Sequence, residues 1–419
     1  MTVVPNGWML YTPHDIAGLA KDALVIGPFG SNLKMSDYCD EGVPLVFVKE
    51  IRAEDFSRPR AYVSTAKAAE LEAHQVLPGD ILITKMGDPP GDVALYDSDV
   101  PGIITADCIR LRPMAGFDRR YLVHSLRTPS ARRQIDAITT GAAQQKVSLD
   151  RFRTRLHISA PPLAEQKRIA AVLDAVDALC VKRREAIALL EDLAQSIFLE
   201  MFGTPENTRW PMASFGEHVE EFRYGTSSKS APNGNIALRI PNVIGGALDT
   251  SDLKRVPVTS DELTRLRLRA GDLLFVRSNG NPDYVGRCAA FTPEVFGQDD
   301  RGDIVYASYL IRARLSRTSM NSTYVRAFMS SVAGRGALRR KAKTSAGQYN
   351  LNIQGLASME IPIPPMVEQE RFAAVIEQVE TAKKAHRTHL AVLDELFTSL
   401  QHRAFSGTLW DHEATGEAA

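Results

Sequence analysis

Several residue types that can carry catalytic or metal chemistry are present, but their spacing matches none of the usual patterns. Residues 27–31 read GPFGS and lack the G-x-x-x-x-G-K-[ST] spacing of a phosphate-binding loop, so we interpret them as a turn. The 9 histidines include no H-E-x-x-H pair. His386 and His389 fall in a predicted helix, where a solvated or packing role is expected. We therefore expect no catalytic residue, no metal and no cofactor in this chain.

One segment does suggest a catalytic motif. Residues 88–91 read DPPG, and they resemble the Asp/Asn-Pro-Pro-aromatic loop with which amino-methyltransferases hold a flipped base. Glycine replaces the aromatic residue, so no ring is available to stack on an extruded base. No convincing glycine-rich cofactor loop precedes the segment. We therefore disfavour a methyltransferase that carries its own catalytic domain.

Basic residues gather in two segments, although the chain has no net charge, with 50 basic and 50 acidic residues. The segments contain Arg127, Arg132, Arg133, Lys146, Arg151, Arg153 and Arg155 in the first and Arg335, Arg339, Arg340, Lys341 and Lys343 in the second. Lysine and arginine neutralise the phosphates of nucleic acids. A solvated helix face is the alternative for either segment alone, and the duplication favours nucleic-acid binding.

A loop rich in glycine or glutamine accompanies each basic segment. Residues 140–146 read TGAAQQK, and residues 344–350 read TSAGQYN. Glutamine and asparagine can pair with adenine edges, and glycine allows the backbone to approach closely. Together with other polar loop positions, the residues that we predict to contact DNA are Ser31, Asn32, Lys34, Lys49, Lys85, Gln144, Gln145, Lys146, Ser228, Lys229, Arg239, Asn242, Arg277, Asn279, Gln348, Tyr349 and Asn350.

The chain repeats itself with a period of about two hundred residues. Residues 161–168 read PPLAEQKR and residues 364–371 read PPMVEQER, 203 positions later, and each opens a long helical pattern. Upstream, LPGDILI at residues 77–83 resembles LRAGDLLF at residues 268–275. This period is too long for a solenoid. It predicts a duplicated two-part module with pseudo-two-fold symmetry.

Each copy is predicted to contain a globular domain followed by a long helix. Apolar runs such as residues 45–48 and 80–84 lie between Gly, Pro and Asp turns, which is typical of strands, and a helical pattern follows over residues 119–138. The fold class is therefore α+β, with helices packed at one side of a curled sheet. The predicted boundaries are 1–160 for the first domain, 161–203 for the central helix, 204–363 for the second domain, 364–409 for the C-terminal helix and 410–419 for a disordered tail.

Both long helices carry apolar residues at three-four spacing, with a polar interruption at Arg183 in the first and at His386 in the second. An antiparallel coiled coil accounts for this pattern, because polar residues in a seam commonly fix its register. Two amphipathic helices that each pack on their own domain are the alternative. A helix of roughly 37 residues spans about 55 Å.

Composition bounds the class of protein. The 419 residues are 44% hydrophobic and 24% charged, which is ordinary for two or three globular domains. The first 22 residues do not read as an export signal, and nowhere do eighteen apolar residues run together, so no membrane association is expected. The 4 cysteines are scattered without a C-x-x-C pair. This spacing argues against a zinc site or a disulfide framework and predicts a cytoplasmic protein.

These motifs resemble the specificity subunits of type I restriction-modification systems over essentially the whole chain. The resemblance rests on GPFGSNLK at residues 27–34, YGTSSK at residues 224–229 and above all the two Pro-Pro-x-x-Glu-Gln helix starts. It implies two target-recognition domains that each bind the major groove at one half of a split, asymmetric DNA site. It also implies two antiparallel helices that act as the ruler between these domains.

The resemblance further implies partners for a non-catalytic chain. Two modification subunits dock on it and carry S-adenosylmethionine-dependent adenine methylation, and restriction subunits add ATP-driven translocation and cleavage. The predicted partner-binding residues on the helices are Glu165, Gln166, Ile169, Glu368, Gln369 and Phe372. The second copy lacks the GPFG opening, so the two half-sites are expected to differ. The alternatives are a coiled-coil protein-interaction scaffold and the specificity module of a related DNA-modifying defence system.

Overall fold

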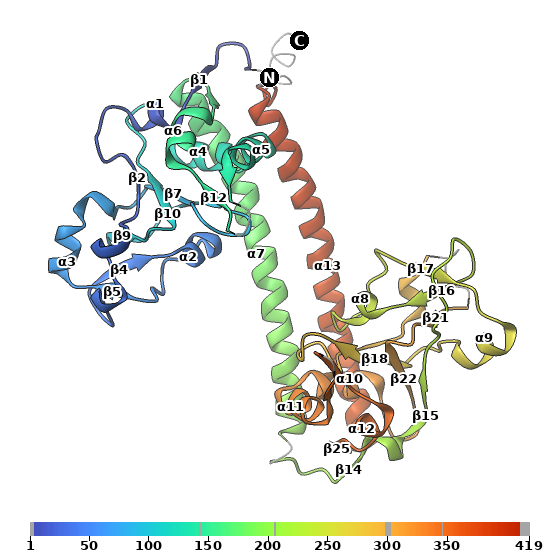
Figure 1. Ribbon diagram of the computed structural model, residues 1–419. Helices are drawn as coiled ribbons and strands as arrows, with labels where there is room; N and C mark the ends of the chain where they lie inside the picture. The colour runs from blue at the N-terminus through green and yellow to red at the C-terminus, as the bar shows by residue number, and fades with distance from the viewer. Residues whose placement is uncertain (1–3, 142–143, 205–206, 298–302, 346, 411–419) are drawn as a thin grey trace. The chain divides into compact units, whose positions relative to one another are not determined.

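The chain divides into two compact units (Figure 1). The computed structural model describes residues 4–141, 144–204, 207–297, 303–345 and 347–410. Unit 1 comprises Met1–Arg183 and His389–Ala419, and unit 2 comprises Arg184–Thr388. The two 40-residue helices α7 (Leu163–Phe202) and α13 (Met366–Phe405) each contribute one half to each unit. Each unit is therefore a globular domain together with halves of both long helices.

Unit 1 contains two main sheets. The first has the order β2-β10-β7-β8, from β2 (Leu24–Ile26), β10 (Cys108–Leu111), β7 (Ile81–Thr84) and β8 (Val93–Leu95), with every pairing antiparallel. The second has the order β3-β5-β4-β9-β6, from β3 (Tyr38–Cys39), β5 (Tyr62–Val63), β4 (Val43–Val46), β9 (Gly102–Ile104) and β6 (Gln75–Val76). Ile81, Leu82 and Ile83 are each 0% exposed, so both faces of β7 are buried.

Short elements complete unit 1. They are β1 (Met9–Tyr11) paired with β13 (Ile158–Ala160), the hairpin β11 (Thr139–Thr140) and β12 (Lys146–Val147), and the helices α1 (Pro13–Ala17), α2 (Val48–Ala53), α3 (Thr65–Glu70), α4 (Arg119–Leu126), α5 (Pro129–Ile138) and α6 (Leu149–Arg155). The helical pattern expected over residues 119–138 is thus two helices. Thr128 caps α5, and Pro129 at its first position cannot continue α4.

Unit 2 contains a corresponding main sheet of four strands. Its order is β15-β22-β18-β20, from β15 (Val219–Tyr224), β22 (Leu310–Leu315), β18 (Leu273–Val276) and β20 (Cys288–Ala290). The other strands are β17 (Lys254–Val256), β16 (Asn235–Leu238) and β21 (Val305–Tyr306) in one sheet, β19 (Ser278–Asn279), β24 (Gln348–Asn350) and β23 (Lys343–Ser345) in another, and the pair β14 (Met212–Ser214) and β25 (Glu360–Pro362). The helices are α8 (Ile240–Val243), α9 (Ser260–Leu266), α10 (Ser322–Ser330), α11 (Val332–Lys341) and α12 (Ile353–Ala357).

The ends of the long helices belong to the domain cores. In unit 1 the ring of Phe405 from α13 lies 5.4 Å from that of Tyr121. In unit 2 the ring of Phe202 from α7 lies 4.8 Å from that of Tyr324, at the positions 203 residues away. Both tyrosines are 0% exposed. The mixed helix-and-sheet fold with two long helices is confirmed. The C-terminal end of each long helix packs on the domain of the other copy, and the coiled coil stays a prediction.

One boundary needs correction. Trp410, placed by prediction in a disordered tail, is only partly exposed, and the Arg168 guanidinium lies 4.0 Å from its ring centroid. The prediction is wrong for Trp410, because its large ring buries apolar area against the unit 1 core. The remainder of the predicted tail, residues 411–419, lies outside the described residues.

Candidate nucleic-acid interface

Three of the segments predicted to contact DNA meet where β7 ends in unit 1. The ammonium of Lys85 lies 4.4 Å from the ring centroid of Phe29 and donates to the carbonyl of Ala106 at 3.2 Å. The Lys85 carbonyl accepts from the Val147 amide at 2.8 Å, which places Lys146 beside it. We call residues 27–34, Lys85, residues 139–141 and residues 144–147 the strand-end surface of unit 1.

The electrostatics of this surface favour an anion. Partial burial lowers the pKa of Lys85, nearby Asp107 raises it, and Lys146 lowers it further. The Phe29 ring beneath the ammonium is 52% exposed. Two neighbouring cations and an exposed aromatic face can hold a phosphate or the edge of a base.

Unit 2 has a similar cation-on-ring arrangement at the end of β18, with the ring supplied by the end of β15. The guanidinium of Arg277 lies 4.6 Å from the ring centroid of Tyr224 and donates to the carbonyl of Ser308 at 3.3 Å. The Arg277 carbonyl accepts from the Leu351 amide at 2.8 Å. Arg277, Tyr224 and the three strands β19, β24 and β23 form the strand-end surface of unit 2.

The strand-end surface of unit 2 has a more extensive sheet. Ser278 pairs with Asn350, and Asn279 pairs with Tyr349, so the predicted loop 344–350 is a β-hairpin with a third strand. Gln348, the first residue of β24, is exposed. The structure therefore brings Arg277, Asn279, Gln348, Tyr349 and Asn350 together.

The predicted contact residues of the unit 1 surface and those outside both surfaces differ in their exposure. Exposed positions are Ser31, Asn32, Lys34, Lys49, Gln144, Gln145, Lys146 and Lys229, and Ser228 is partly exposed. Arg239 is bound by the carboxylate of Asp252 at 2.8 Å. These residues stay predictions.

The prediction for Asn242 needs correction. Its side chain is 1% exposed, its Oδ1 accepts from the Arg239 amide at 2.9 Å, and its Nδ2 donates to the carbonyls of Asp249 and Asp252. Both amide hydrogens are used, and the side chain is buried from any base. The prediction that Asn242 contacts DNA is wrong, because the side chain closes the first turn of α8.

Only some of the cations in the two basic segments are exposed to solvent, because others are held by partners within the protein. Arg127 donates to the carbonyl of Val93 and binds Glu54, and Arg335 donates to the carbonyls of Asp283 and Val285. Other internal partners hold Arg132, Arg153 and Arg339. The exposed cations of the two segments are Arg133, Lys146, Arg155, Arg339, Arg340, Lys341 and Lys343.

The DPPG loop is held by internal contacts. The Arg52 guanidinium donates to the Pro89 carbonyl and to the Asp92 carboxylate, each at 2.7 Å. Gly91 has φ +93°, and a Cβ there would meet a methyl carbon of Ile135 at 2.5 Å. An aromatic side chain at position 91 has no room, so this loop cannot supply the ring that a base-holding loop needs.

Four of the six predicted partner-binding residues are also corrected. Gln166 and Gln369 are 2% and 0% exposed, and Ile169 and Phe372 are each 0% exposed in the cores of their own units. A partner cannot reach them. Glu165 and Glu368 are partly exposed and stay predictions.

Two buried carboxylates that position the strand ends are not among the residues predicted from sequence. Asp80 accepts two hydrogen bonds from Arg112, at 2.8 and 2.7 Å, and Asp272 accepts two from Arg314, at 2.9 and 2.7 Å. These pairs fasten β7 to β10 and β18 to β22. The signal was present in the sequence, because the Gly-Asp and the Arg-x-Arg occur in both copies.

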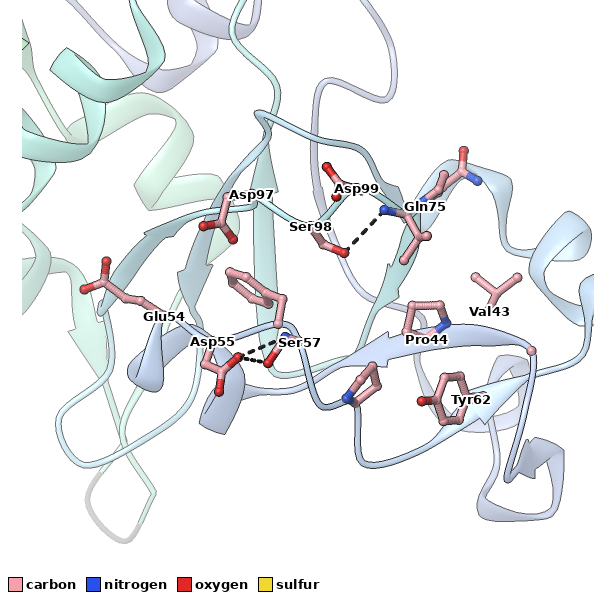
Figure 2. Close-up of a pocket in the computed structure, with 15 residues that line it drawn as sticks. Val43, Pro44, Glu54, Asp55, Ser57, Tyr62, Gln75, Asp97, Ser98 and Asp99 are labelled. Atoms are coloured by element: carbon pink, nitrogen blue, oxygen red, sulfur yellow. Dashed lines mark hydrogen bonds between the residues drawn. The ribbon is translucent and has the colours of Figure 1, made fainter. Parts of the chain in front are cut away.

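A cavity of about 800 Å³ in unit 1 lies outside this interface. Figure 2 shows Glu54, Asp55, Asp97 and Asp99 around it. Hydrogen bonds from the side chain and backbone of Ser57 lower the pKa of Asp55. Carboxylates on this wall repel phosphates. No group of acidic, histidine or cysteine side chains that could hold a metal occurs among the described residues.

Two further properties concern the described part of the chain. No helix there is long and apolar enough to cross a bilayer. The four cysteines are free, with Cys39 exposed and Cys108, Cys180 and Cys288 buried.

The fold consists of two mixed helix-and-sheet units that share two long helices, and each unit has a strand-end surface. Residues 51–189 match the family described as type I restriction modification DNA specificity domain. The chain is similar to the specificity subunits of type I restriction-modification systems over most of its length. Specificity subunits are the non-catalytic DNA-recognition components of these systems.

The similarity to two curated relatives extends over nearly the whole length. The specificity subunit of the type I restriction enzyme EcoKI from Escherichia coli K12 is 27% identical, over 97% of this chain and 90% of the relative. That of StySPI from Salmonella potsdam is 23% identical over the same shares. The fold is similar to an S subunit from M. genitalium, with TM-score 0.58, 12% identity and coverage of 95% and 96%. A chain from a structure of type I complex assembly and conformational transition gives TM-score 0.51, 16% identity and coverage of 97% and 100%.

Proposed function

We propose that this chain is the subunit that recognises DNA for a type I restriction-modification complex, and that its two domains read the two halves of a split, asymmetric site. The single observation that carries the proposal is the repeated strand-end surface. In each unit a cation lies on an aromatic ring at the end of a buried strand, beside a hairpin with exposed polar side chains.

The two surfaces are suited to different bases. A guanidinium can bind guanine O6 and N7 through two parallel hydrogen bonds, whereas an ammonium acts as a point charge toward a base or a phosphate. Arg277 and Lys85 occupy corresponding places, so the same position in the two half-sites would be read differently. Gln144 and Gln145 in unit 1 and Gln348 and Asn350 in unit 2 supply amides that fit adenine edges.

The long helices are proposed to act as the ruler and as the docking place for two modification subunits, with restriction subunits joining the complex. A helix of 40 residues is about 60 Å long, which exceeds one turn of DNA, about 34 Å. In unit 2 the halves of α7 and α13 run antiparallel, since Glu191 binds Lys383 and Arg387 while Phe198 contacts Phe372.

The proposal is tested by co-expressing the chain with the modification subunit of its own operon and mapping methylated adenines by single-molecule sequencing. We expect one bipartite motif with two different halves. Exchange of residues 1–160 for a homologous domain should change one half only. A change in both halves, or in neither, would contradict the proposal.

The competing function is a protein-interaction scaffold, and salt dependence separates it from DNA binding. Binding to a fluorescein-labelled duplex that carries the mapped site should weaken steeply with salt, with a slope of about −0.9 per phosphate contacted in a plot of log K against log salt concentration. A stable complex with the modification subunit that methylates nothing and shows no such slope would favour the scaffold.

A further inference from the structure

Two buried glutamines connect the long helices to the domains. Gln166, in the first turn of α7, is 2% exposed. Its Oε1 accepts from the Asp118 amide at 2.9 Å, and its Nε2 donates to the carbonyls of Pro161 at 2.8 Å and Gly116 at 3.4 Å. One side chain thus joins the start of α7 to the loop before α4 and to the end of β13.

Gln369, in the first turn of α13, makes the corresponding contacts. It is 0% exposed, its Oε1 accepts from the Asn321 amide at 2.9 Å, and its Nε2 donates to the carbonyls of Pro364 at 2.9 Å and Ser319 at 3.0 Å. Each partner lies 203 residues after its counterpart in unit 1. The two networks therefore repeat atom for atom.

The three hydrogen bonds hold each helix more strictly than apolar packing does. Hydrogen bonds are directional, and the partners are backbone groups on two separate segments of the domain. Ile169 and Phe372, three residues further along each helix, are each 0% exposed and hold the same helix face. A rotation or tilt of the first turn would break at least one of these hydrogen bonds.

A small tilt at this point has a large effect. Each helix is unbroken over 40 residues, so a tilt of about 5° at its start displaces its other end by about 5 Å over about 60 Å of length. The spacing along DNA is about 3.4 Å per base pair. A tilt of this size therefore corresponds to more than one base pair.

We propose that Gln166 and Gln369 are positioning residues that fix the direction in which each long helix leaves its domain and thereby set the spacer length that the protein accepts. The inference rests on the proposed function, because a spacer exists only if two half-sites are read. Neither glutamine contacts DNA or a partner subunit in this role.

The test uses Gln166→Met and Gln369→Met, in which methionine keeps the length of the side chain but makes none of the three hydrogen bonds. Lys167→Met is the matched control, because Lys167 is exposed at the next position of α7. Full-length variants in complex with the modification subunit are titrated with fluorescein-labelled duplexes. The duplexes carry the mapped half-sites with the natural spacer or with one or two base pairs added or removed.

We expect the natural protein and Lys167→Met to bind duplexes with altered spacers about tenfold more weakly for each base pair changed, because the DNA must be bent or twisted. Either glutamine variant should reduce this preference to about threefold or less while both half-site sequences stay unchanged. An equal loss of affinity for all spacers, or an unchanged preference, would overturn the inference.

Thermal unfolding of each variant accompanies the titrations. Should Gln166→Met not fold, Gln166→Glu, which keeps the acceptor for the Asp118 amide and removes the donors, takes its place. Failure of all these glutamine variants to fold would overturn the inference by assigning the glutamines to folding alone. If the natural protein itself recognises no bipartite site, the proposed function fails, and this outcome is seen before any variant is made.

Discussion

Unit 1 and unit 2 use corresponding residues in their interiors and different residues at their strand-end surfaces. Inside, Tyr121 and Tyr324 each donate to a backbone carbonyl at 2.7 Å, and Gln166 and Gln369 make matching networks. At the surfaces, Lys85 in unit 1 corresponds to Arg277 in unit 2, but the ring beside each comes from a different position: Tyr224 stands at the place of Ile26, three residues before Phe29. The buried residues that build the two domains therefore stay the same while the side chains at the strand-end surfaces differ.

One buried arginine departs from this correspondence. In unit 1 Arg110 is 1% exposed and donates to the carbonyls of Gln75 and Asp22, and burial lowers its pKa to about 10. In unit 2 Arg312 is 0% exposed and binds the carboxylate of Glu221. Both arginines also have the other kind of partner, since Asp80 lies 4.0 Å from Arg110 and Arg312 donates to the carbonyls of Arg265 and Arg267. The carboxylate of Glu221 in direct contact with Arg312 is what unit 2 adds.

The largest effect is expected from removing the buried carboxylate charges. Asp80→Asn and Asp272→Asn each place an amide against a guanidinium, and we expect each to lower the free energy of unfolding by about 3 kcal/mol. The loss should be larger for Asp80, because Asp80 also faces the buried Arg110 at 4.0 Å, whereas Arg314 keeps the carboxylate of Glu221 at 3.7 Å when Asp272 is changed. Urea unfolding monitored by hydrogen exchange in each unit measures both, with exposed Asp99→Asn as control. A loss in the free energy of unfolding below about 1 kcal/mol for either variant would refute the role of these carboxylates in fastening neighbouring strands.

The strand-end surfaces provide the next prediction. Lys85→Met and Arg277→Met should each weaken DNA binding by about tenfold to a hundredfold, which is about 1.4–2.7 kcal/mol. Each variant should relax one half-site only. Fluorescence anisotropy at several salt concentrations measures the effect, and Lys21→Met, an exposed cation that precedes β2, is the control. Relaxation of both half-sites by either variant would break the assignment of one surface to one half-site.

Glu221 gives a prediction for unit 2 alone. Partial burial raises its pKa, but hydrogen bonding to Arg223 and the charges of Arg312 and Arg314 outweigh this and hold the pKa below its ordinary value of 4.5. Its stabilisation is therefore present above about pH 4.5 and lost as the pH falls through the lowered pKa. Glu221→Gln should cost about 1–2 kcal/mol at pH 7, allowing for its partial exposure. Urea unfolding at pH 7 and pH 3 should show this difference shrinking; a constant difference would contradict the ion pair.

The smallest expected effects test the interiors. Tyr121→Phe and Tyr324→Phe each remove one hydroxyl and leave the Ser159 or Pro362 carbonyl without that donor. Burial raises the pKa of both phenols, so both are donors at neutral pH. Each change should lower the free energy of unfolding by about 1 kcal/mol. Urea unfolding measures both losses. Unequal losses would show that the two hydroxyls have the same geometry but contribute different free energies of unfolding.

The parts predicted from sequence were those that repeat or follow a regular period. The long helices and the β7 and β18 segments were evident because apolar spacing and the Gly-Asp motif occur in both copies. The roles of polar side chains were harder to predict, because their partners lie far along the chain. Gln166 and Asn242 were assigned to partners and DNA, yet Gln166 bonds to a backbone amide 48 residues away. Residue type alone does not distinguish a side chain that satisfies the backbone from one that reads a base.

The division of the chain into units has a consequence for its synthesis. Unit 2 is continuous in sequence, from Arg184 to Thr388, whereas unit 1 needs residues from both ends, including Ala404 and Phe405 in its core. Domains generally fold as units while the chain emerges from the ribosome. Unit 2 can therefore fold as soon as it has been translated, while the domain that is made first must wait until the last helix is complete.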